Sequence, residues 1–353
     1  MRTKQQAMKR RRTKGPAYAA LLAGLGLAAL LALALTPGAG SGSAPGYAAG
    51  TAAFAAGGNT FVSAASTSIG LRSAALEPLD ELTPGFGRPA AAGGEGGAAA
   101  WDIGGSELVY AAPGGEAGTL GVTGSLVSAD VNAAGYVAAV SLTEEELGLV
   151  TVFSPEGEEL YRWHFNSAWP LAAAVSPDGE ALAVLAASEQ GGEVRLARLD
   201  GTEQLASYTL PGEYFFRLGW LDGGALCAVS AHRALVLDTL CTIADERAFA
   251  PYEATDAAFG EGFAAVALSG EGGHALLTVD AAGEAGFTAL PAAPLSLDAG
   301  GGRVLCLAGE RALFFDRSLR ATAERDAQGA HSALLRDGGA LLVGRDSVKL
   351  IYV

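Results

Sequence analysis

The residue types that most often bind metals are few in this chain and widely separated. The four histidines are His164, His232, His274 and His331, and no two of them have the spacing of paired metal ligands. A zinc or iron site needs several such groups that converge on one point. We therefore expect each histidine to be structural or exposed to solvent, and we predict no metal site.

Other catalytic patterns are also missing from the sequence. It has no GxSxG nucleophile elbow and no glycine-rich phosphate loop followed by Lys-Ser or Lys-Thr. The acidic run from Glu144 to Glu146 lacks the alternating ligands of a calcium loop, so we interpret it as a solvated loop. The odd cysteine count argues against a disulfide framework, and we expect buried thiols at Cys227, Cys241 and Cys306. The sequence predicts no catalytic residue and no cofactor.

Two aromatic clusters, at residues 161–169 and 214–220, are the strongest candidates for a binding surface in a chain with only 7% aromatic residues. Rigid aromatic rings anchor many interfaces, but they also fill the space between packed sheets. The rings at 161, 163 and 165 alternate along one strand face, which favours packing for them. We predict Trp169, Tyr214 and Trp220 as binding residues.

The elements that position these residues repeat with a period of about 40 residues from position 51 onward. Each unit contains short strands separated by turns. The expected first strands of the units begin near Thr51, Phe86, Leu126, Pro170, Tyr214, Ala254, Ala293 and His331. This period predicts an all-β fold, a β-propeller of about eight four-stranded blades with WD40-like repeats. Seven blades is the alternative if the sparse region 86–122 forms no blade of its own.

Turn chemistry supports the repeat. Ser-Pro-Asp-Gly at 176–179 has Pro preset for a turn and Gly suited to a left-handed backbone, and related turns occur at 221–224 and 336–339. We interpret all three as hairpins between the first and second strands of a blade. The last unit supplies three strands before the chain ends, so a fourth is expected from around Tyr47, or the last blade has three strands. The apolar hexamer 348–353 is expected to be a buried strand of this closing blade.

The first 50 residues have the pattern of a membrane-anchored protein. Residues 1–16 are a basic tail, and the run from Ala17 to Leu35 is uncharged and long enough to cross a bilayer as a helix. Basic residues before the run place the N-terminus in the cytoplasm. The run is predicted to be a signal anchor, with a cleaved signal peptide and secretion as the alternative. Residues 36–50 are a Gly/Pro/Ser/Ala linker, and residues 51–353 form the predicted extracytoplasmic domain.

The charge of the predicted domain argues against a nucleic acid partner. The chain has 23 basic and 38 acidic residues, and seven of the basic ones lie in the first 14 positions. An acidic domain repels phosphates.

Several stretches resemble a known bacterial family, the domain-of-unknown-function family 5711. The resemblance is carried by 128–140 (SADVNAAGYVAAV), 150–163 (VTVFSPEGEELYRW), 175–184 (VSPDGEALAV) and 225–238 (ALCAVSAHRALVLD), and it extends to 334–350. It implies a short basic tail, one membrane helix and a propeller-like exported domain. It implies no catalytic residue, because the family has no assigned activity.

We expect a binding or scaffolding module at the cell envelope, attached to the membrane through residues 17–35, with a protein or cell-envelope partner. The alternative is a propeller enzyme, such as a hydrolase, lyase or quinone-dependent dehydrogenase, with its site at the central channel. Converging His, Asp, Glu or Arg side chains at the channel mouth favour the enzyme, and exposed aromatic residues on one rim favour binding.

Overall fold

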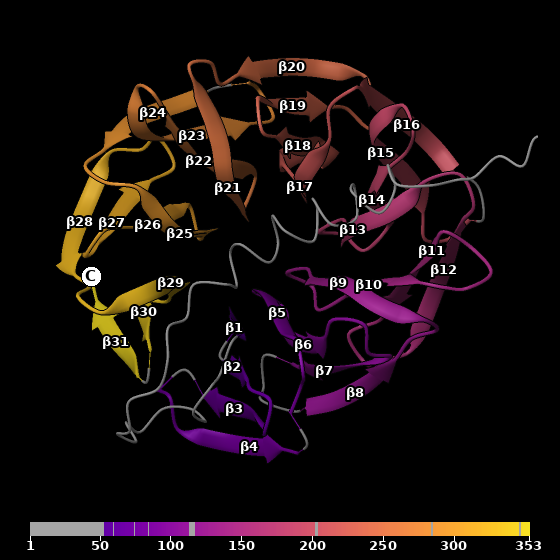
Figure 1. The fold of residues 1–353 in the computed structure, drawn as a ribbon, viewed down its shortest axis with the longest axis horizontal. Helices are drawn as coiled ribbons and strands as arrows, with labels where there is room; N and C mark the ends of the chain where they lie inside the picture. The colour runs from indigo at the N-terminus through magenta and orange to yellow at the C-terminus, as the bar shows by residue number, and fades with distance from the viewer. Residues whose placement is uncertain are drawn as a thin grey trace, which may run out of the picture. The chain divides into compact units, whose positions relative to one another are not determined.

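The computed structural model describes residues 53–58, 60–73, 75–83, 85–112, 117–201, 204–283, 285–345 and 347–353. These residues form eight antiparallel sheets, the blades, arranged around a central axis (Figure 1). Within each blade the strands follow one another in chain order, from the innermost to the outermost. The predicted tail 1–16, helix 17–35 and linker 36–50 lie outside the described residues. None of the described segments is a helix long and apolar enough to cross a bilayer.

The first four blades each have four strands. Blade 1 contains β1 (Ala53–Gly57), β2 (Thr60–Ala64), β3 (Ile69–Ser73) and β4 (Pro78–Leu82), and blade 2 contains β5 (Pro89–Gly94), β6 (Gly97–Asp102), β7 (Glu107–Ala111) and β8 (Ala117–Gly121). Blade 3 contains β9 (Ser125–Val131), β10 (Val137–Leu142), β11 (Gly148–Phe153) and β12 (Glu159–Phe165), and blade 4 contains β13 (Trp169–Val175), β14 (Ala181–Ala187), β15 (Gly191–Arg198) and β16 (Gln204–Pro211).

The second half of the ring ends in a shorter blade. Blade 5 contains β17 (Phe215–Trp220), the 3₁₀ turn η1 (Asp222–Gly224), β18 (Leu226–Ser230), β19 (Arg233–Leu237) and β20 (Ile243–Ala248), and blade 6 contains β21 (Tyr252–Gly260), β22 (Phe263–Gly270), β23 (Gly273–Asp280) and β24 (Ala285–Leu290). Blade 7 contains β25 (Pro294–Gly300), β26 (Arg303–Ala308), β27 (Arg311–Asp316) and β28 (Ala321–Asp326), and blade 8 contains β29 (Ala330–Arg336), β30 (Gly339–Gly344) and β31 (Val348–Tyr352).

The prediction of eight blades is confirmed, and the seven-blade alternative is wrong. The sparse region 86–122 forms blade 2, because small residues such as Ala98, Ala99 and Ala100 pack as a fully buried strand. Four strands per blade is correct for blades 1–7. Blade 8 has three strands among the described residues, and the region around Tyr47 that was expected to complete it lies outside them.

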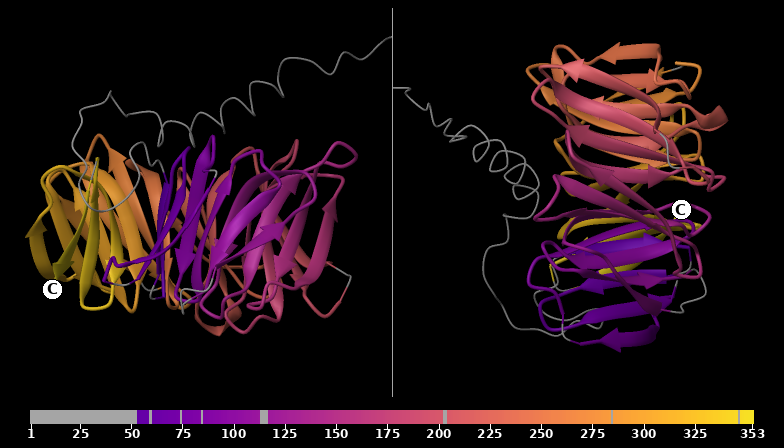
Figure 2. Two further views of the ribbon diagram at one scale, coloured as in Figure 1. Left: turned by 90° about the horizontal axis from the view of Figure 1, so that it is seen from below. Right: turned by 90° about the vertical axis from the view of Figure 1, so that its right-hand side faces the viewer.

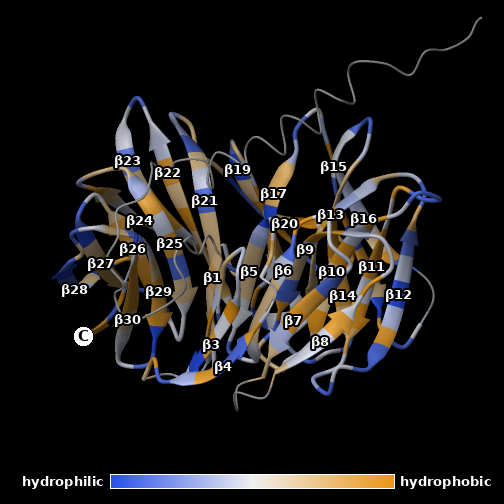
Figure 3. Ribbon diagram, turned by 60° about the horizontal axis from the view of Figure 1, so that its bottom comes forward, coloured by the Kyte–Doolittle hydropathy of each residue, from blue (hydrophilic) through white to orange (hydrophobic). Residues whose placement is uncertain are grey.

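The core lies between neighbouring blades. Seven clusters of buried apolar residues join blades 1 to 8 in sequence, each shared by two adjacent blades. The second strands are almost wholly buried because neighbouring sheets cover both of their faces, which explains their unbroken apolar sequences. Figure 3 shows hydrophobic colour on strands inside the blades and hydrophilic colour at many of the turns.

The three predicted hairpin turns are confirmed at the inner strands. Ser176 Oγ accepts a hydrogen bond from Ala181 N at 2.9 Å, and Gly179 has φ of 75°, a left-handed backbone that favours glycine. Gly223 and Gly338 have φ of 70° and 68° at the equivalent places in blades 5 and 8. These turns fix the registers of the innermost strands, which carry the candidate site.

Candidate functional site

The innermost strands β1, β5, β9, β13, β17, β21, β25 and β29 run in the same direction between the two faces of the ring. Figure 2 shows the blades edge-on, with the strands crossing from one face to the other. We name the face at which these strands begin the upper face, and the face at which they end the lower face. Residues at the start and end of one innermost strand therefore lie on opposite faces.

Six consecutive innermost strands carry a bulge at the same place near the upper face. In β17, for example, Phe215 pairs with Ser230 and Arg217 with Val229, which leaves Phe216 without a partner in the ladder. Such bulges redirect side chains and often occur beside functional sites. We name the six bulged residues the upper collar: Val127, Leu171, Phe216, Thr255, Leu295 and His331. The collar is predominantly apolar, and the side chain of Leu295 is 55% exposed.

Trp169 and Tyr214 stand at matching positions of blades 4 and 5, each two residues before the bulge. Both are partly buried. Trp169 pairs with Ala187, at the start of the β14–β15 turn, and the Tyr214 hydroxyl donates to Ser188 O in that turn at 3.2 Å. The two predicted aromatic residues therefore border the same turn on the upper face.

The sequence holds this arrangement in place through two features. Gly192 N donates to Glu213 O at 2.7 Å, and a Cβ at Gly192 would lie 2.9 Å from Phe215 N, so only glycine allows this close approach. Pro170 follows Trp169 without disrupting the sheet, because an innermost strand has one unpaired edge that tolerates a missing N–H. The backbone at Trp169 is held by pairing with Ala187, and the backbone next to Tyr214 is held by the close approach of Gly192.

Trp220, the third predicted binding residue, lies at the opposite end of β17, on the lower face. Its Nε1 donates to Ala174 O of blade 4 at 3.0 Å, and its ring packs against the core shared by blades 4 and 5. The structure brings Trp169 and Tyr214 to one face and does not bring Trp220 to them.

Below the collar, charged side chains link the innermost strand of blade 5 to that of blade 6, and the innermost strand of blade 7 to that of blade 8. Arg217 Nη2 lies 3.3 Å from Asp256 Oδ1, and its Cζ lies 5.9 Å from the Phe216 ring centroid. Asp298 Oδ2 accepts a hydrogen bond from Leu335 N of blade 8 at 2.6 Å. These contacts tie adjacent blades together and bring Arg217 under the collar.

The channel carboxyl groups have raised pKa values. Burial raises the pKa of Asp130 and of Asp298 to about 6, although backbone N–H groups oppose the shift in both. Burial also raises the pKa of Asp256, against the opposing effect of Arg217. The side chains are partly open to water but are surrounded by neighbouring inner strands, so a carboxylate there loses most of its hydration.

A second cluster of carboxyl groups lies on the lower face, at the turns that follow the innermost strands. The pKa of Glu95 in blade 2 is raised above its usual value. The largest cause is a hydrogen bond to Glu261 of blade 6, and burial is the second. The negative charges of Glu261 and Asp337 raise the pKa further. Acidic side chains from three blades thus approach one another. No group of three or more His, Cys, Asp or Glu among the described residues is arranged to hold a metal ion.

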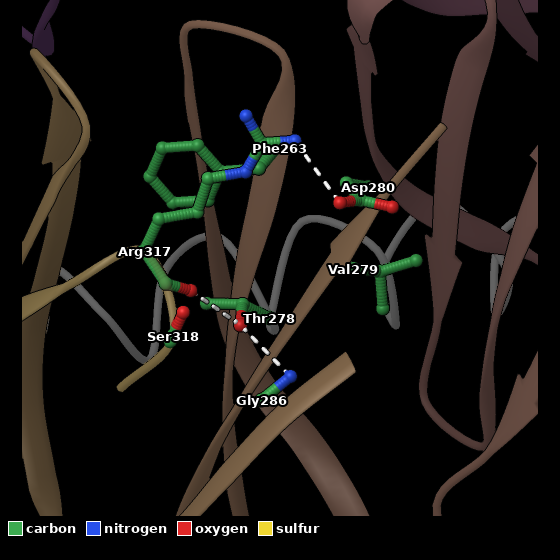
Figure 4. A pocket seen from close by; sticks show the side chains of 7 residues that line it. All are labelled: Phe263, Thr278, Val279, Asp280, Gly286, Arg317 and Ser318. Carbon is green, nitrogen blue, oxygen red and sulfur yellow. Dashed lines mark hydrogen bonds and ion pairs between the residues drawn. The ribbon is translucent and has the colours of Figure 1, made fainter. Parts of the chain in front are cut away.

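A cavity of about 330 Å³ lies between blades 6 and 7, on the lower face (Figure 4). Arg317 projects over Phe263 and bonds Asp280 Oδ2 at 3.1 Å and Gly262 O at 3.2 Å. Its Nη1 lies 3.6 Å from Asp222 of blade 5. The cation is already neutralised by two carboxylates, so we interpret this cluster as a junction of three blades and not as a ligand site.

The histidines lie in four different blades, as their spacing indicates. His164 contacts Glu146 at 2.8 Å, His274 contacts Ser269 at 2.9 Å, and His232 lies 4.0 Å from Glu253. The three cysteines are buried, as predicted.

Sequence reasoning missed the collar and the channel acids. The collar residues differ in type from blade to blade, so no motif marks them. Counting back from the inner hairpins would have aligned Asp130 with Asp298, and Trp169 with Tyr214, because the innermost strands share one register.

Residues 83–196 match DUF5711, a family of unknown function. The match confirms the resemblance predicted from the sequence over blades 2 and 3 and most of blade 4. The two resembling stretches at 225–238 and 334–350 lie outside the matched residues of DUF5711. No curated protein matches the sequence.

Solved structures confirm the propeller fold. The C-terminal WD40 domain of Sif2 has a TM-score of 0.64 at 8% identity, over 86% of this chain and 95% of that one. The β-propeller domain of Cps50 (Swd1) from Myceliophteria thermophila has a TM-score of 0.52 at 10% identity, over 76% and 96%. Hydrazine synthase from Kuenenia stuttgartiensis has 0.52 at 10% identity, over 90% and 99%. At these identities the likeness concerns the fold alone.

Proposed function

We propose that this protein is a binding module of the cell envelope, a membrane-anchored extracytoplasmic β-propeller that holds a protein partner on its upper face. The observation that carries the proposal is the pair Trp169 and Tyr214, two partly buried aromatic residues at matching positions of adjacent blades. The fold itself does not decide function, because propellers serve both binding and catalysis.

The chemistry of the upper face favours a partner with apolar side chains. Aromatic anchors set in fixed backbone lose little conformational entropy when they bind, and such residues carry much of the energy of protein interfaces. Beside the pair lie the bulged Leu171 and Phe216, which are partly buried and also pack against the cores between blades. Arg217, adjacent to Phe216, pairs with Asp256 of blade 6 and supports the collar from below.

A capture experiment tests the proposal. Detergent-solubilised full-length protein, Trp169→Ala, Tyr214→Ala and the double variant are compared for the proteins they retain from their own membranes. The matched control is Trp163→Ala, on the outer strand β12, where the ring packs 4.9 Å from Phe165. A partner lost from the double variant and kept by the control supports the proposal, and equal retention by all variants refutes it.

The location is proposed from residues 17–35 and the basic residues before them. A single cysteine added after Val353 reports the side of the membrane. Labelling of intact cells by an impermeant maleimide is expected. Labelling that needs cell lysis refutes export, and a mature protein that lacks residues 17–35 supports the secreted alternative.

An enzyme with its site at the channel remains the second candidate, because Glu95 and Glu261 share a hydrogen bond beside Asp337. A carboxyl group whose pKa is raised by a neighbouring acid, as that of Glu95 is, is a common feature of acid–base sites. Glu95→Gln and Glu261→Gln test whether the acids of the lower face take part in binding. Binding at the upper collar predicts that these variants retain the partner, whereas loss of the partner would favour the lower face.

A further inference from the structure

Four arginines of the described residues each have a buried side-chain nitrogen that forms no hydrogen bond: Arg72, Arg233, Arg247 and Arg336. Two of them have a carboxylate beside the guanidinium, since Arg233 lies 3.0 Å from Glu213 and Arg247 lies 2.8 Å from Asp245. Arg72 and Arg336 have no ion pair within the described part of the chain. A buried charge without a counter-charge is costly, so these two arginines point to a missing anion.

Arg336 and Arg72 lie on facing sides of one seam, between the neighbouring blades 8 and 1 (Figure 1). Leu335 packs against the core shared with blade 7, and side chains alternate along a strand, so Arg336 faces blade 1. Leu71 packs against the core shared with blade 2, so Arg72 faces blade 8. Both residues stand at or next to the end of a strand that runs towards the lower face.

The guanidinium of Arg336 is enclosed by the fold. Arg336 is only 8% exposed, and its Nη1 is fully buried without a partner. Burial lowers the pKa of Arg336, and the charge of the adjacent Asp337 opposes this effect without forming an ion pair. Arg303 Nη2 donates to Arg336 O at 3.0 Å, which fixes the backbone that carries the side chain.

The turn after β3 holds Arg72 in a defined position. Arg72 Nη1 donates to Leu76 O at 3.1 Å, which leaves the buried Nε as the donor without a partner. Leu76 has φ of 65°, a left-handed backbone that is unusual for leucine and that occurs more often at functional sites.

The terminal strand β31 forms the outer part of the blade 8 side of the seam. The hexamer 348–353 contains this strand, as expected, but the expectation that it is buried is wrong: only Ile351 of β31 is buried, because no fourth strand covers it among the described residues. Tyr352 pairs with Gly339, which pairs with Arg336, so all three residues share one sheet face. Tyr352 is 71% exposed, so water reaches the lower edge of the seam there.

We propose that the lower end of the seam between blades 8 and 1 binds an oxyanion, a carboxylate or phosphate group, through Arg336 Nη1 and Arg72 Nε. The strand β29 faces β1, and β3 lies two strand spacings farther out, about 10 Å, an offset that two arginine side chains and one anion together can span. Charge-assisted N–H donors match the oxygens of such a group. The site lies on the face opposite to Trp169 and Tyr214, so it is independent of the partner proposed above.

Anion titration of the detergent-solubilised full chain tests the site. Sodium phosphate and, separately, sodium acetate are titrated by calorimetry at an ionic strength held constant with sodium chloride. Saturable binding to the parent is expected, and binding of phosphate alone would assign the site to phosphate groups. Arg336→Gln and Arg72→Gln are each expected to weaken binding about tenfold or more, the effect of losing one hydrogen bond to a charged group. The control is Arg311→Gln, at an exposed ion pair with Glu324.

Thermal melting separates binding from folding. Arg336→Gln removes a buried charge, so without phosphate or acetate it is expected to melt at or above the parent temperature, and the anion that binds the parent should stabilise the parent alone. A variant that melts well below the parent would show that the guanidinium already has a partner within the chain, which overturns the proposal. Absence of saturable binding, or equal affinities for the parent and both seam variants, also overturns it. Equal weakening in Arg311→Gln would reduce the effect to general surface charge and contradict the site.

Discussion

Trp169 and Tyr214 occupy the same position in two adjacent blades, each two residues before the bulge in its innermost strand. One turn, between β14 and β15, lies beside both, since Trp169 pairs with Ala187 and the Tyr214 hydroxyl reaches Ser188 O. The repeat that builds the ring thereby places two aromatic residues, 45 positions apart in sequence, on one rim. This is the arrangement on which a binding function depends.

The stability of the propeller should depend on pH through Asp130. The folded pKa of about 6 lies above the value of 3.8 for a free aspartate, so the folded state binds the proton more tightly. The stability from this group is complete below about pH 4 and is lost as the pH rises through about 6. Asp130→Asn removes that loss. We expect a melting temperature about 2–5 °C higher than that of the parent at about pH 7.5 and equal to it at about pH 4.

Asp298→Asn is the informative comparison for Asp130→Asn. Asp298 has a similar pKa, but it accepts backbone hydrogen bonds from Leu335 N and Ala299 N, and an amide has only one oxygen for both. We expect Asp298→Asn to give no stabilisation at about pH 7.5, because an unsatisfied buried N–H costs about 1–3 kcal/mol. Equal stabilisation by both substitutions would contradict the assigned contacts.

The junction of blades 5, 6 and 7 at Arg317 should contribute measurable stability. Its guanidinium contacts Asp280, Gly262 O and the Phe263 ring, so Arg317→Ala is expected to lower the free energy of unfolding by about 1–2 kcal/mol. Arg311→Ala is the control, because Arg311 forms an exposed ion pair with Glu324. Such exposed pairs typically contribute about 0.2–1 kcal/mol. Denaturant unfolding of both variants checks the difference, and equal losses would refute the junction.

The cysteines should be unreactive in the folded protein. Burial raises the pKa of Cys227 and of Cys306 to about 12 and that of Cys241 to about 11, and the thiolate is the reactive form. Iodoacetamide at neutral pH is expected to modify none of them until denaturant is added. Mass spectrometry counts the adducts, and rapid modification of any one under native conditions would show that its blade opens.

The sequence predicted the ring well and the site only in part. Turns such as Ser176–Gly179 and unbroken apolar strands such as β14 are local features, so the blades can be located without tertiary information. Blade 2 was harder, since Ala98, Ala99 and Ala100 become a strand only through packing between blades. Trp169 begins the innermost strand β13, and Trp220 ends the innermost strand β17. Because the innermost strands run in the same direction, these two residues lie on opposite faces of the ring. The link between Arg217 and Asp256 joins two blades, and no local pattern signals it.

The most direct test of the binding function places one photo-reactive residue on each face. Benzoylphenylalanine at position 169 samples the upper face and at position 220 samples the lower face, where Trp220 bonds Ala174 O. A partner on the upper face predicts that irradiation in intact membranes gives a discrete protein adduct from position 169 and none from position 220. An adduct from position 220 alone, or none from either position, would contradict binding at the collar.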